Sequence, residues 1–177
     1  NIEEYTCYGE TRDRANSIIV DLSVALEEFD LQLNNKKTKI EELPDTVLED
    51  WVRKLNGFSL LTSYGKVDYK QARAYFDLAI ELMKISGGNA SVLNYAIKVL
   101  SKQNLTDNAK GYSWKMSMHL CILYPYLLSI MDEYVFKAFG APKDEIQKFI
   151  DLAYEDGLEK QNYEECSYAI YFALKYD

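Results

Sequence analysis

Residues 67–88, "VDYKQARAYFDLAIELMKISGG", decide the fold class of this chain. Apolar residues recur there every three or four positions and share one helical face: Tyr69, Ala72, Phe76, Ala79, Ile80 and Met83. Because an α-helix has about 3.6 residues per turn, this spacing predicts an amphipathic helix over 67–85. Gly87 and Gly88 should end it, since glycine readily adopts the left-handed conformation found after helices.

The same helical pattern fills the rest of the chain toward the C-terminus, and no further strand is predicted there. We expect helices over 45–55, 67–85, 91–103, 108–124, 126–139 and 143–154, and a last helix opened by the capping-box spacing of Asn162 and Glu165. Short breaks between helices favour antiparallel pairs, and about three such hairpins can stack a continuous core. The sequence therefore predicts a mainly α fold over 45–177, either an irregular antiparallel helical repeat (HEAT-like) or a bundle.

The last predicted helix has an apolar stripe, and two of the three cysteines lie within such stripes. The stripe of the last helix is Cys166, Ala169, Ile170, Ala173 and Leu174. Cys7, Cys121 and Cys166 are far apart in sequence and lack C-x-x-C spacing, so we interpret them as reduced thiols.

Residues 1–44 have a different pattern, which predicts a strand, a helix and a hairpin. Residues 5–10 are rich in the aromatic and Thr residues of strands, and Thr11 has the side chain of a helix N-cap. In "LQLNNKKTKIEELP" (31–44), Leu31 and Leu33 alternate as in a strand, Asn34 and Asn35 favour a turn, and 37–43 can return. We therefore expect a small β-α-β region ending at Pro44, followed by the helical region from residue 45.

The composition and net charge disfavour some classes of protein. The chain has 177 residues and a net charge of −8, which disfavours a nucleic-acid footprint spread over the whole surface. Residues 143–177 are the most acidic part, with nine Asp and Glu against four Lys. No apolar run has the length of a membrane span and no signal peptide is recognisable, so we predict a cytoplasmic protein without a membrane partner.

Three sets of residues are candidates for chemistry. The adjacent carboxylates Glu3 and Glu4 could hold divalent cations, or they could be a solvated pair near a terminus. Lys36, Lys37 and Lys39 form a local basic patch that could meet phosphates, or they could be the charged edge of a hairpin. His119, the only histidine, is interpreted as a packed core residue, because no nucleophile stands at a motif spacing from it.

The order of these segments resembles the end of the palm of bacterial reverse transcriptases. In that family a turn of the form Phe/Tyr-x-Asp-Asp-Tyr is followed by a helix and by a strand pair built around Leu-x-Leu-Asn-x-x-Lys-Thr. Here "NIEEYTCY" (1–8) stands in the place of the Asp-Asp turn, and "LQLNNKKTKI" (31–40) matches the second motif. "NYAIKVLSKQNLTDNAKGY" (94–112) and "SYAIYFALKYD" (167–177) look like the helical repeat domain of abortive-infection-type reverse transcriptases.

The resemblance implies a set of roles for the N-terminal residues. Glu3 and Glu4 would occupy the positions of the two metal-binding aspartates, with Glu in place of Asp, and Lys37 and Thr38 would match the Lys-Thr pair. Nucleotide or nucleic acid would meet Lys36, Lys37, Thr38 and Lys39. The intact parent would use Mg²⁺ for nucleotidyl transfer.

The resemblance also implies that the chain, with no initiator Met at Asn1, is a piece of a larger protein. Residues 1–44 would be the palm remnant, and 45–177 would brace the polymerase core in phage defence. The fingers and the strand holding the other catalytic aspartate are not in the sequence, so we expect this piece alone to be inactive and to need no cofactor. Its expected partners are the rest of the core, nucleic acid at 36–39 and a second copy of itself. The competing hypothesis is a free-standing helical scaffold that binds a protein partner.

Overall fold

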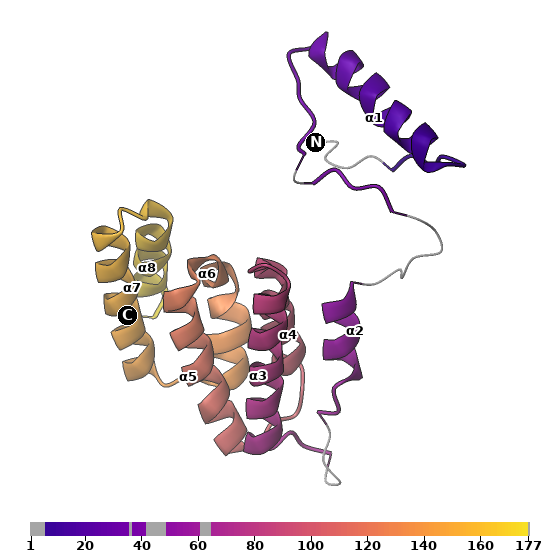
Figure 1. The fold of residues 1–177 in the computed structure, drawn as a ribbon. Helices are drawn as coiled ribbons and strands as arrows, with labels where there is room; N and C mark the ends of the chain where they lie inside the picture. The colour runs from indigo at the N-terminus through magenta and orange to yellow at the C-terminus, as the bar shows by residue number, and fades with distance from the viewer. Residues whose placement is uncertain (1–5, 36, 42–48, 61–64, 177) are drawn as a thin grey trace. The chain divides into compact units, whose positions relative to one another are not determined.

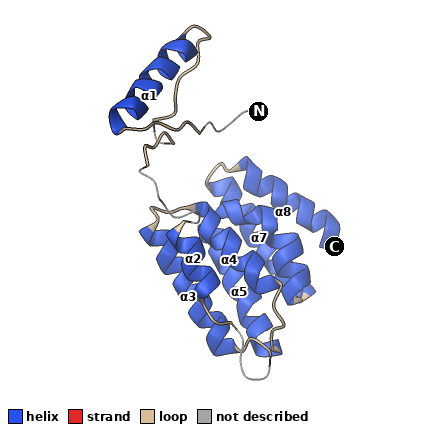
Figure 2. Ribbon diagram, turned by 90° about the vertical axis from the view of Figure 1, so that its right-hand side faces the viewer, coloured by secondary structure: helices blue, strands red, loops and turns tan. Residues whose placement is uncertain are grey.

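The computed structural model describes residues 6–35, 37–41, 49–60 and 65–176. The chain divides into two compact units, Asn1–Val47 and Leu48–Asp177. In the described ranges, helices make up nearly all of the regular structure and no strand ladder forms (Figure 2). The predicted mainly α class is therefore confirmed.

The first unit contains one long helix, α1 (Arg12–Glu27). Its N-cap is the predicted Thr11, whose Oγ1 accepts a hydrogen bond of 3.2 Å from the backbone N–H of Arg14. Within this unit α1 buries none of its side chains, and Val20 and Val24 are each more than half exposed. The amphipathic helix is thus formed by local signals, while its apolar stripe remains without a covering layer in this unit.

The predicted β-elements of the first unit do not form in the residues that the structure describes. Residues 6–10 lead into α1 without pairing, and 31–35 and 37–41 form a turn rather than a hairpin. A short strand needs a neighbouring strand for its backbone hydrogen bonds, and an isolated hairpin is marginally stable in water. The described part of this unit therefore shows the helix of the predicted β-α-β region and not its strands.

The second unit is a layered stack of helices (Figure 1). Its elements are α2 (Asp50–Gly57), α3 (Tyr69–Ile85), α4 (Ala90–Ser101), α5 (Asp107–Leu123), the 3₁₀ turn η1 (Pro125–Leu127), α6 (Leu128–Ile130), the π-helix η2 (Met131–Lys137), α7 (Lys143–Glu159) and α8 (Tyr163–Tyr176). The predicted helices over 67–85, 91–103 and 108–124 agree with α3, α4 and α5 to within about two residues. Gly87 and Gly88 have positive φ and follow the end of α3, as their chemistry predicted.

A short backbone bridge aligns the starts of α3 and α5. The N–H of Val67 donates to the carbonyl of Asn104 at 2.9 Å, and the N–H of Thr106 donates to the carbonyl of Val67 at 3.0 Å. Asp68 then caps α3 in a capping box with Gln71, and the side chain of Thr106 caps α5. Helices α3 and α5, which begin side by side, pack against each other, and α4 packs against α3 with its apolar face buried: Val92, Leu93, Ala96, Ile97 and Leu100.

The predicted continuous helix over 126–139 is instead broken into three pieces. Pro125 opens a 3₁₀ turn after α5, α6 makes a single turn, and η2 then has π-helical geometry. A π-helix holds more residues per turn than an α-helix, so side-chain directions shift relative to a 3.6-residue pattern. Phe136 of η2 is consequently directed to the last two helices, with ring centroids 5.8 Å from Phe149 of α7 and 5.3 Å from Phe172 of α8.

The last two helices, α7 and α8, form a tight antiparallel hairpin at one end of the stack (Figures 1 and 2). Gly157 of α7 makes the closest approach, because a Cβ atom there would lie 2.9 Å from the sulfur of Cys166 and 3.2 Å from its backbone nitrogen. Ala153 and Ala169 are buried along the same hairpin. Small side chains therefore let the two helix backbones come together.

The apolar stripe predicted for α8 is only partly correct. Cys166 and Ala169 are buried and Ala173 is half-buried, but Ile170 is 51% exposed and Leu174 is 83% exposed. Phe172 occupies the core instead, at 1% exposure. Helix α8 itself has apolar residues on most of its faces, so the periodicity of its sequence does not determine which face packs against the core.

The close approach at Gly157 gives a stability prediction. Gly157→Ala should lower the free energy of unfolding by about 1–3 kcal/mol, because the new methyl group overlaps Cys166 and the carbonyl of Asn162. Chemical denaturation of the purified chain would measure it. Gly111→Ala in α5 is the matched control: nothing lies within 4 Å of its Cβ position, so helix propensity should stabilise that variant by about 0.5–1 kcal/mol. Equal effects of the two substitutions would contradict the packing at Gly157.

Candidate functional site

The structure places only some of the predicted site residues. Glu3, Glu4 and Lys36 lie outside the described residues, so their predicted roles stay predictions. Lys37, Thr38 and Lys39 are described: Lys37 and Thr38 close a turn on the carbonyl of Asn34, and Lys39 follows it. Among the described residues no group of three or more His, Cys, Asp and Glu side chains is arranged to hold a metal ion.

The turn before Lys39 uses the hydroxyl that the sequence pattern singled out. The backbone N–H groups of Lys37 and Thr38 both donate to the carbonyl of Asn34 at 2.9 Å, and Thr38 Oγ1 donates to the same oxygen at 3.0 Å. Thr38 therefore stabilises the turn with its side chain, while Lys37 and Lys39 are exposed. The arrangement presents two cations on one short segment.

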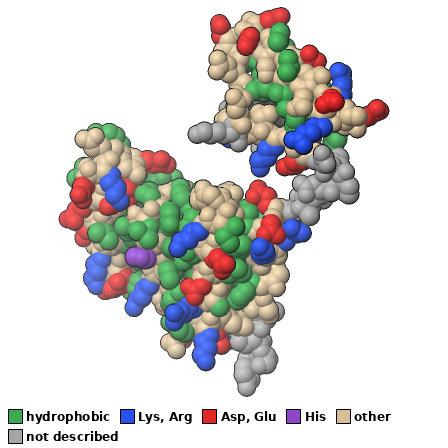
Figure 3. Space-filling model, viewed as in Figure 1, with side chains coloured by type: hydrophobic (Ala, Val, Ile, Leu, Met, Phe, Trp, Pro, Cys, Tyr) green, Lys and Arg blue, Asp and Glu red, His purple; other side chains and the backbone are tan. Residues whose placement is uncertain are grey.

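His119 is not a core residue, contrary to its interpretation from sequence. It lies in α5 with its side chain exposed, and it is the purple side chain on the surface in Figure 3. The buried face of α5 is formed by Trp114, Met118 and Cys121 instead. A polar residue flanked on both sides by core positions is turned outward, because neighbouring helix positions differ by about 100°.

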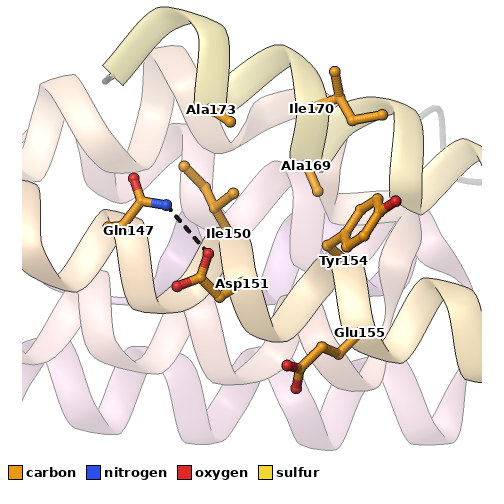
Figure 4. Close-up of a pocket in the computed structure, with 8 residues that line it drawn as sticks. All are labelled: Gln147, Ile150, Asp151, Tyr154, Glu155, Ala169, Ile170 and Ala173. Atoms are coloured by element: carbon orange, nitrogen blue, oxygen red, sulfur yellow. Dashed lines mark hydrogen bonds between the residues drawn. The ribbon is translucent and has the colours of Figure 1, made fainter.

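A groove of about 350 Å³ lies between α7 and α8 on the outer side of the terminal hairpin. Ile150, Ala169 and Ala173 line its apolar part, and Ile170 borders it on α8 (Figure 4). On α7 its lining continues through Gln147, Asp151, Tyr154 and Glu155. No sequence pattern predicts this groove, although the acidic excess of 143–177 falls on the same two helices.

The groove has carboxylates on one side only. Asp151 and Glu155 stand one turn apart on α7, and both are exposed. Asp151 Oδ1 accepts a hydrogen bond of 3.2 Å from Gln147 Nε2, the dashed line in Figure 4. Within the described part of the chain neither carboxylate makes an ion pair, so both negative charges remain available at the groove.

A buried carboxyl group lies at the start of α8. Glu165 is 1% exposed; its Oε2 accepts a hydrogen bond of 3.3 Å from Asn162 Nδ2, and its Oε1 has no partner among the described residues. Its backbone N–H also donates to Asn162 Oδ1 at 3.4 Å, which is one half of the predicted capping box; the backbone N–H of Asn162 donates to the carbonyl of Gly157 instead of to Glu165. Burial and the nearby charge of Asp156 raise the pKa of Glu165, and burial raises the pKa of the Cys121 thiol.

A second polar cluster joins the π-helix to the end of α8. Asp132 of η2 accepts hydrogen bonds from Lys175 Nζ at 2.6 Å, from Lys137 Nζ at 3.3 Å and from the hydroxyl of Tyr176. Burial opposes ionisation of Asp132, but these three donors outweigh it and lower its pKa. The cluster connects η2 to α8 through Asp132 and Lys175, which are 43 residues apart in sequence.

None of the helices in the described ranges is long and apolar enough to cross a membrane. The polar residues of the helical unit are instead distributed over its surface, where acidic side chains gather at the edge formed by α7 (Figure 3). The groove joins an apolar cavity, lined by residues of α7 and α8, to the two carboxylates Asp151 and Glu155 of α7.

The buried Glu165 should give a distinctive pH dependence of stability. Because its pKa is raised in the folded state, the folded chain binds this proton more tightly than the unfolded chain does. The free energy of unfolding should therefore fall as pH rises from the ordinary value of 4.5 through the raised pKa, and Glu165→Gln should remove this component. In denaturation experiments, the free energy of unfolding of the variant relative to that of the unsubstituted chain should be higher at about pH 7 than at about pH 4.

The exposed neighbour Glu164 provides the control for that measurement. Glu164→Gln removes the same charge from the same helical turn without touching a buried group. If both substitutions change the pH dependence equally, the effect comes from net charge and the buried carboxyl is not its source.

Asp132 should change the free energy of unfolding with pH in the direction opposite to Glu165. Its lowered pKa stabilises the fold above the pKa of the unfolded chain, and this contribution is lost as pH falls through the folded value. Asp132→Asn should cost about 1–3 kcal/mol at pH 7, because Lys175 loses its partner, and much less at about pH 3. Asp77→Asn is the control: Asp77 and Arg73 form an exposed pair at 3.8 Å, and its loss should cost less than about 0.5 kcal/mol.

No family model, curated protein or solved structure matches this chain. The features of this chain that bear on function are the motif order of the first unit, the turn before Lys39, and the acidic groove of the last two helices.

Proposed function

We propose that this chain is the C-terminal portion of a reverse-transcriptase-like DNA polymerase of phage defence. In this proposal residues 1–44 complete the palm, and the helical unit braces the polymerase core and offers an interface to nucleic acid or to a second copy. The intact enzyme would transfer nucleotides from deoxynucleoside triphosphates with Mg²⁺, and Glu3 and Glu4 would stand at the metal-binding positions.

The observation that best supports this proposal is the turn that follows Leu33. The resemblance expects a Lys-Thr pair three residues after an Asn, within a strand pair. In the structure Lys37 and Thr38 close that turn on Asn34, and Lys37 is exposed, where it could meet a phosphate. The family has a strand pair at this motif; the described residues form its turn, which follows the amphipathic helix α1 as the resemblance expects, but not its strands.

The uncovered apolar stripe of α1 supports the same proposal. Ile18, Ile19, Leu22 and Leu26 are only half-buried, and no residue of α1 is fully buried. An amphipathic helix of 16 residues gains most of its stability from packing its apolar face. A palm sheet supplied by the rest of a polymerase would provide such a surface.

The helical unit has a continuous core of its own and needs no sheet. Tyr75, Phe76, Phe139 and Phe172 are each at most 2% exposed and belong to one cluster that runs through the stack. This self-sufficiency suits a bracing domain attached to a polymerase. It also favours the second candidate function, a free-standing scaffold that binds a protein partner.

Nucleotide incorporation by the intact parent protein tests the proposal. With Mg²⁺ or Mn²⁺ supplied, the parent should incorporate deoxynucleotides, and the double variant Glu3→Ala with Glu4→Ala should lose at least about a hundredfold in rate, because the metal-binding carboxylates are gone. The 177-residue chain alone should be inactive.

Glu27 and Glu28 give the matched control, since they are an adjacent exposed pair at the other end of α1. Glu27→Ala with Glu28→Ala should leave incorporation within about twofold of the parent, as surface changes usually do. An inactive parent, or equal losses in the two double variants, would overturn the polymerase proposal and leave the scaffold. An upstream coding sequence for palm and fingers would support the polymerase, and a start codon just before Asn1 would favour the scaffold.

A further inference from the structure

The outer face of the α7–α8 hairpin keeps exposed apolar side chains on both sides of its groove. Tyr154 of α7 is 40% exposed and Ile170 of α8 is 51% exposed. Leu158 and Leu174 lie one turn further along their helices on the same faces, and each is more than half exposed. Because the helices are antiparallel, these leucines extend the apolar strip beyond the groove in opposite directions. The strip has the length of about three helical turns.

The charge of this face is acidic and not neutralised by its own lysines. Within the described residues, three of the four lysines of 143–177 are engaged in ion pairs elsewhere: Lys148 with Glu145, Lys160 with Asp156 and Lys175 with Asp132. Asp151 and Glu155 have no such partner in this part of the structure and flank the apolar strip along α7. Two carboxylates one turn apart match cations spaced one turn apart on a facing helix.

We propose that the groove between α7 and α8 binds a basic amphipathic helix of a partner protein. Apolar anchors of that helix, at the spacing i, i+3 or i+4, and i+7, enter the strip between Tyr154 and Ile170. Lys or Arg beside the anchors pairs with Asp151 and Glu155. This inference goes beyond the proposed function and holds whether the parent is a polymerase or a scaffold.

Charge distinguishes this occupant from the others that the surface could accept. A second copy using the same face would bring its own carboxylates against Asp151 and Glu155, and like charges disfavour such pairing. Nucleic acid and anionic membrane surfaces are repelled for the same reason. Helix α1 of this chain is also a poor fit, because its basic residues, Arg12 and Arg14, are confined to its first turn.

The test measures binding of a synthetic peptide to the full chain by fluorescence anisotropy. The peptide has about 18 residues, with Leu at i, i+3, i+4 and i+7 and Lys on the flanks of that stripe. A peptide of the same composition with the order scrambled serves as the control for non-specific attraction. We expect a Kd on the order of 10 μM, weakening at least about tenfold between low and high salt, and no saturable binding of the scrambled peptide.

Reversing the charges of the groove carboxylates and of the peptide lysines tests whether the peptide binds in the groove. Asp151→Lys with Glu155→Lys should weaken binding at least about tenfold, and a peptide with Glu in place of its Lys residues should bind this variant better than the parent chain. Glu81→Lys with Glu133→Lys changes net charge equally at two exposed positions outside the groove and should weaken binding less than about threefold. Circular dichroism and thermal unfolding confirm that each variant is folded.

Three results would overturn the inference. Equal losses in the two double variants would assign the attraction to net charge, and equal binding of the scrambled peptide would remove the helix requirement. Sedimentation that shows self-association abolished by Ile170→Asp would assign the face to a second copy instead. Incorporation of nucleotides by the parent has no bearing on any of these readouts, so the two proposals fail independently.

Discussion

The arrangement of the last third of the molecule depends on Phe136. Its ring lies between the last two helices, edge-on to Phe149, Phe172 and Tyr176 at centroid distances of 5.8, 5.3 and 5.4 Å. Edge-to-face aromatic pairs add directional preference to the area that they bury, so they favour one orientation of the packed helices. This cluster exists because η2 is π-helical and directs Phe136 and Asp132 to the same neighbour.

The hairpin of α7 and α8 consequently makes its packing contacts on its inner side, while its outer side bears the groove. Phe136 and Asp132 hold the inner side, the first through aromatic contacts and the second through Lys175 and Tyr176. Gly157 lets the two backbones come together, and the groove between the same two helices lies on the outer side. Such inner contacts favour recognition on the outer side. The conformational entropy of the two helices is then lost when the chain folds, and less remains to be lost when a partner binds.

Sequence patterns located the helices well where their ends are set by local chemistry. Thr11, Asp68 and Thr106 each cap the helix that follows, and Gly87 and Gly88 end α3 through their backbone freedom. The errors arose where the outcome depends on distant contacts. The π-helix η2 stands where a 3.6-residue pattern predicts a regular helix, and the strands predicted before and after α1 need a partner strand to form.

The candidate groove was beyond sequence reasoning for the same physical cause. Nothing local distinguishes Phe172, which is buried, from Ile170 and Leu174, which are exposed; only the position of α7 and η2 selects between them. The acidic composition of 143–177 was visible, but whether those charges are paired depends on the positions of Lys148, Lys160 and Lys175 in space. The sequence could therefore predict that the surface of 143–177 is negatively charged. It could not predict which of its carboxylates lack an ion-pair partner.

The three cysteines differ in accessibility in a way that has a practical consequence. Cys121 and Cys166 are buried, and Cys7 is exposed. Thiol reagents react with accessible thiolate, and burial keeps Cys121 in its protonated form. A maleimide dye added to the native chain should therefore label Cys7 alone, giving the first unit a single-site optical reporter without any change to the sequence.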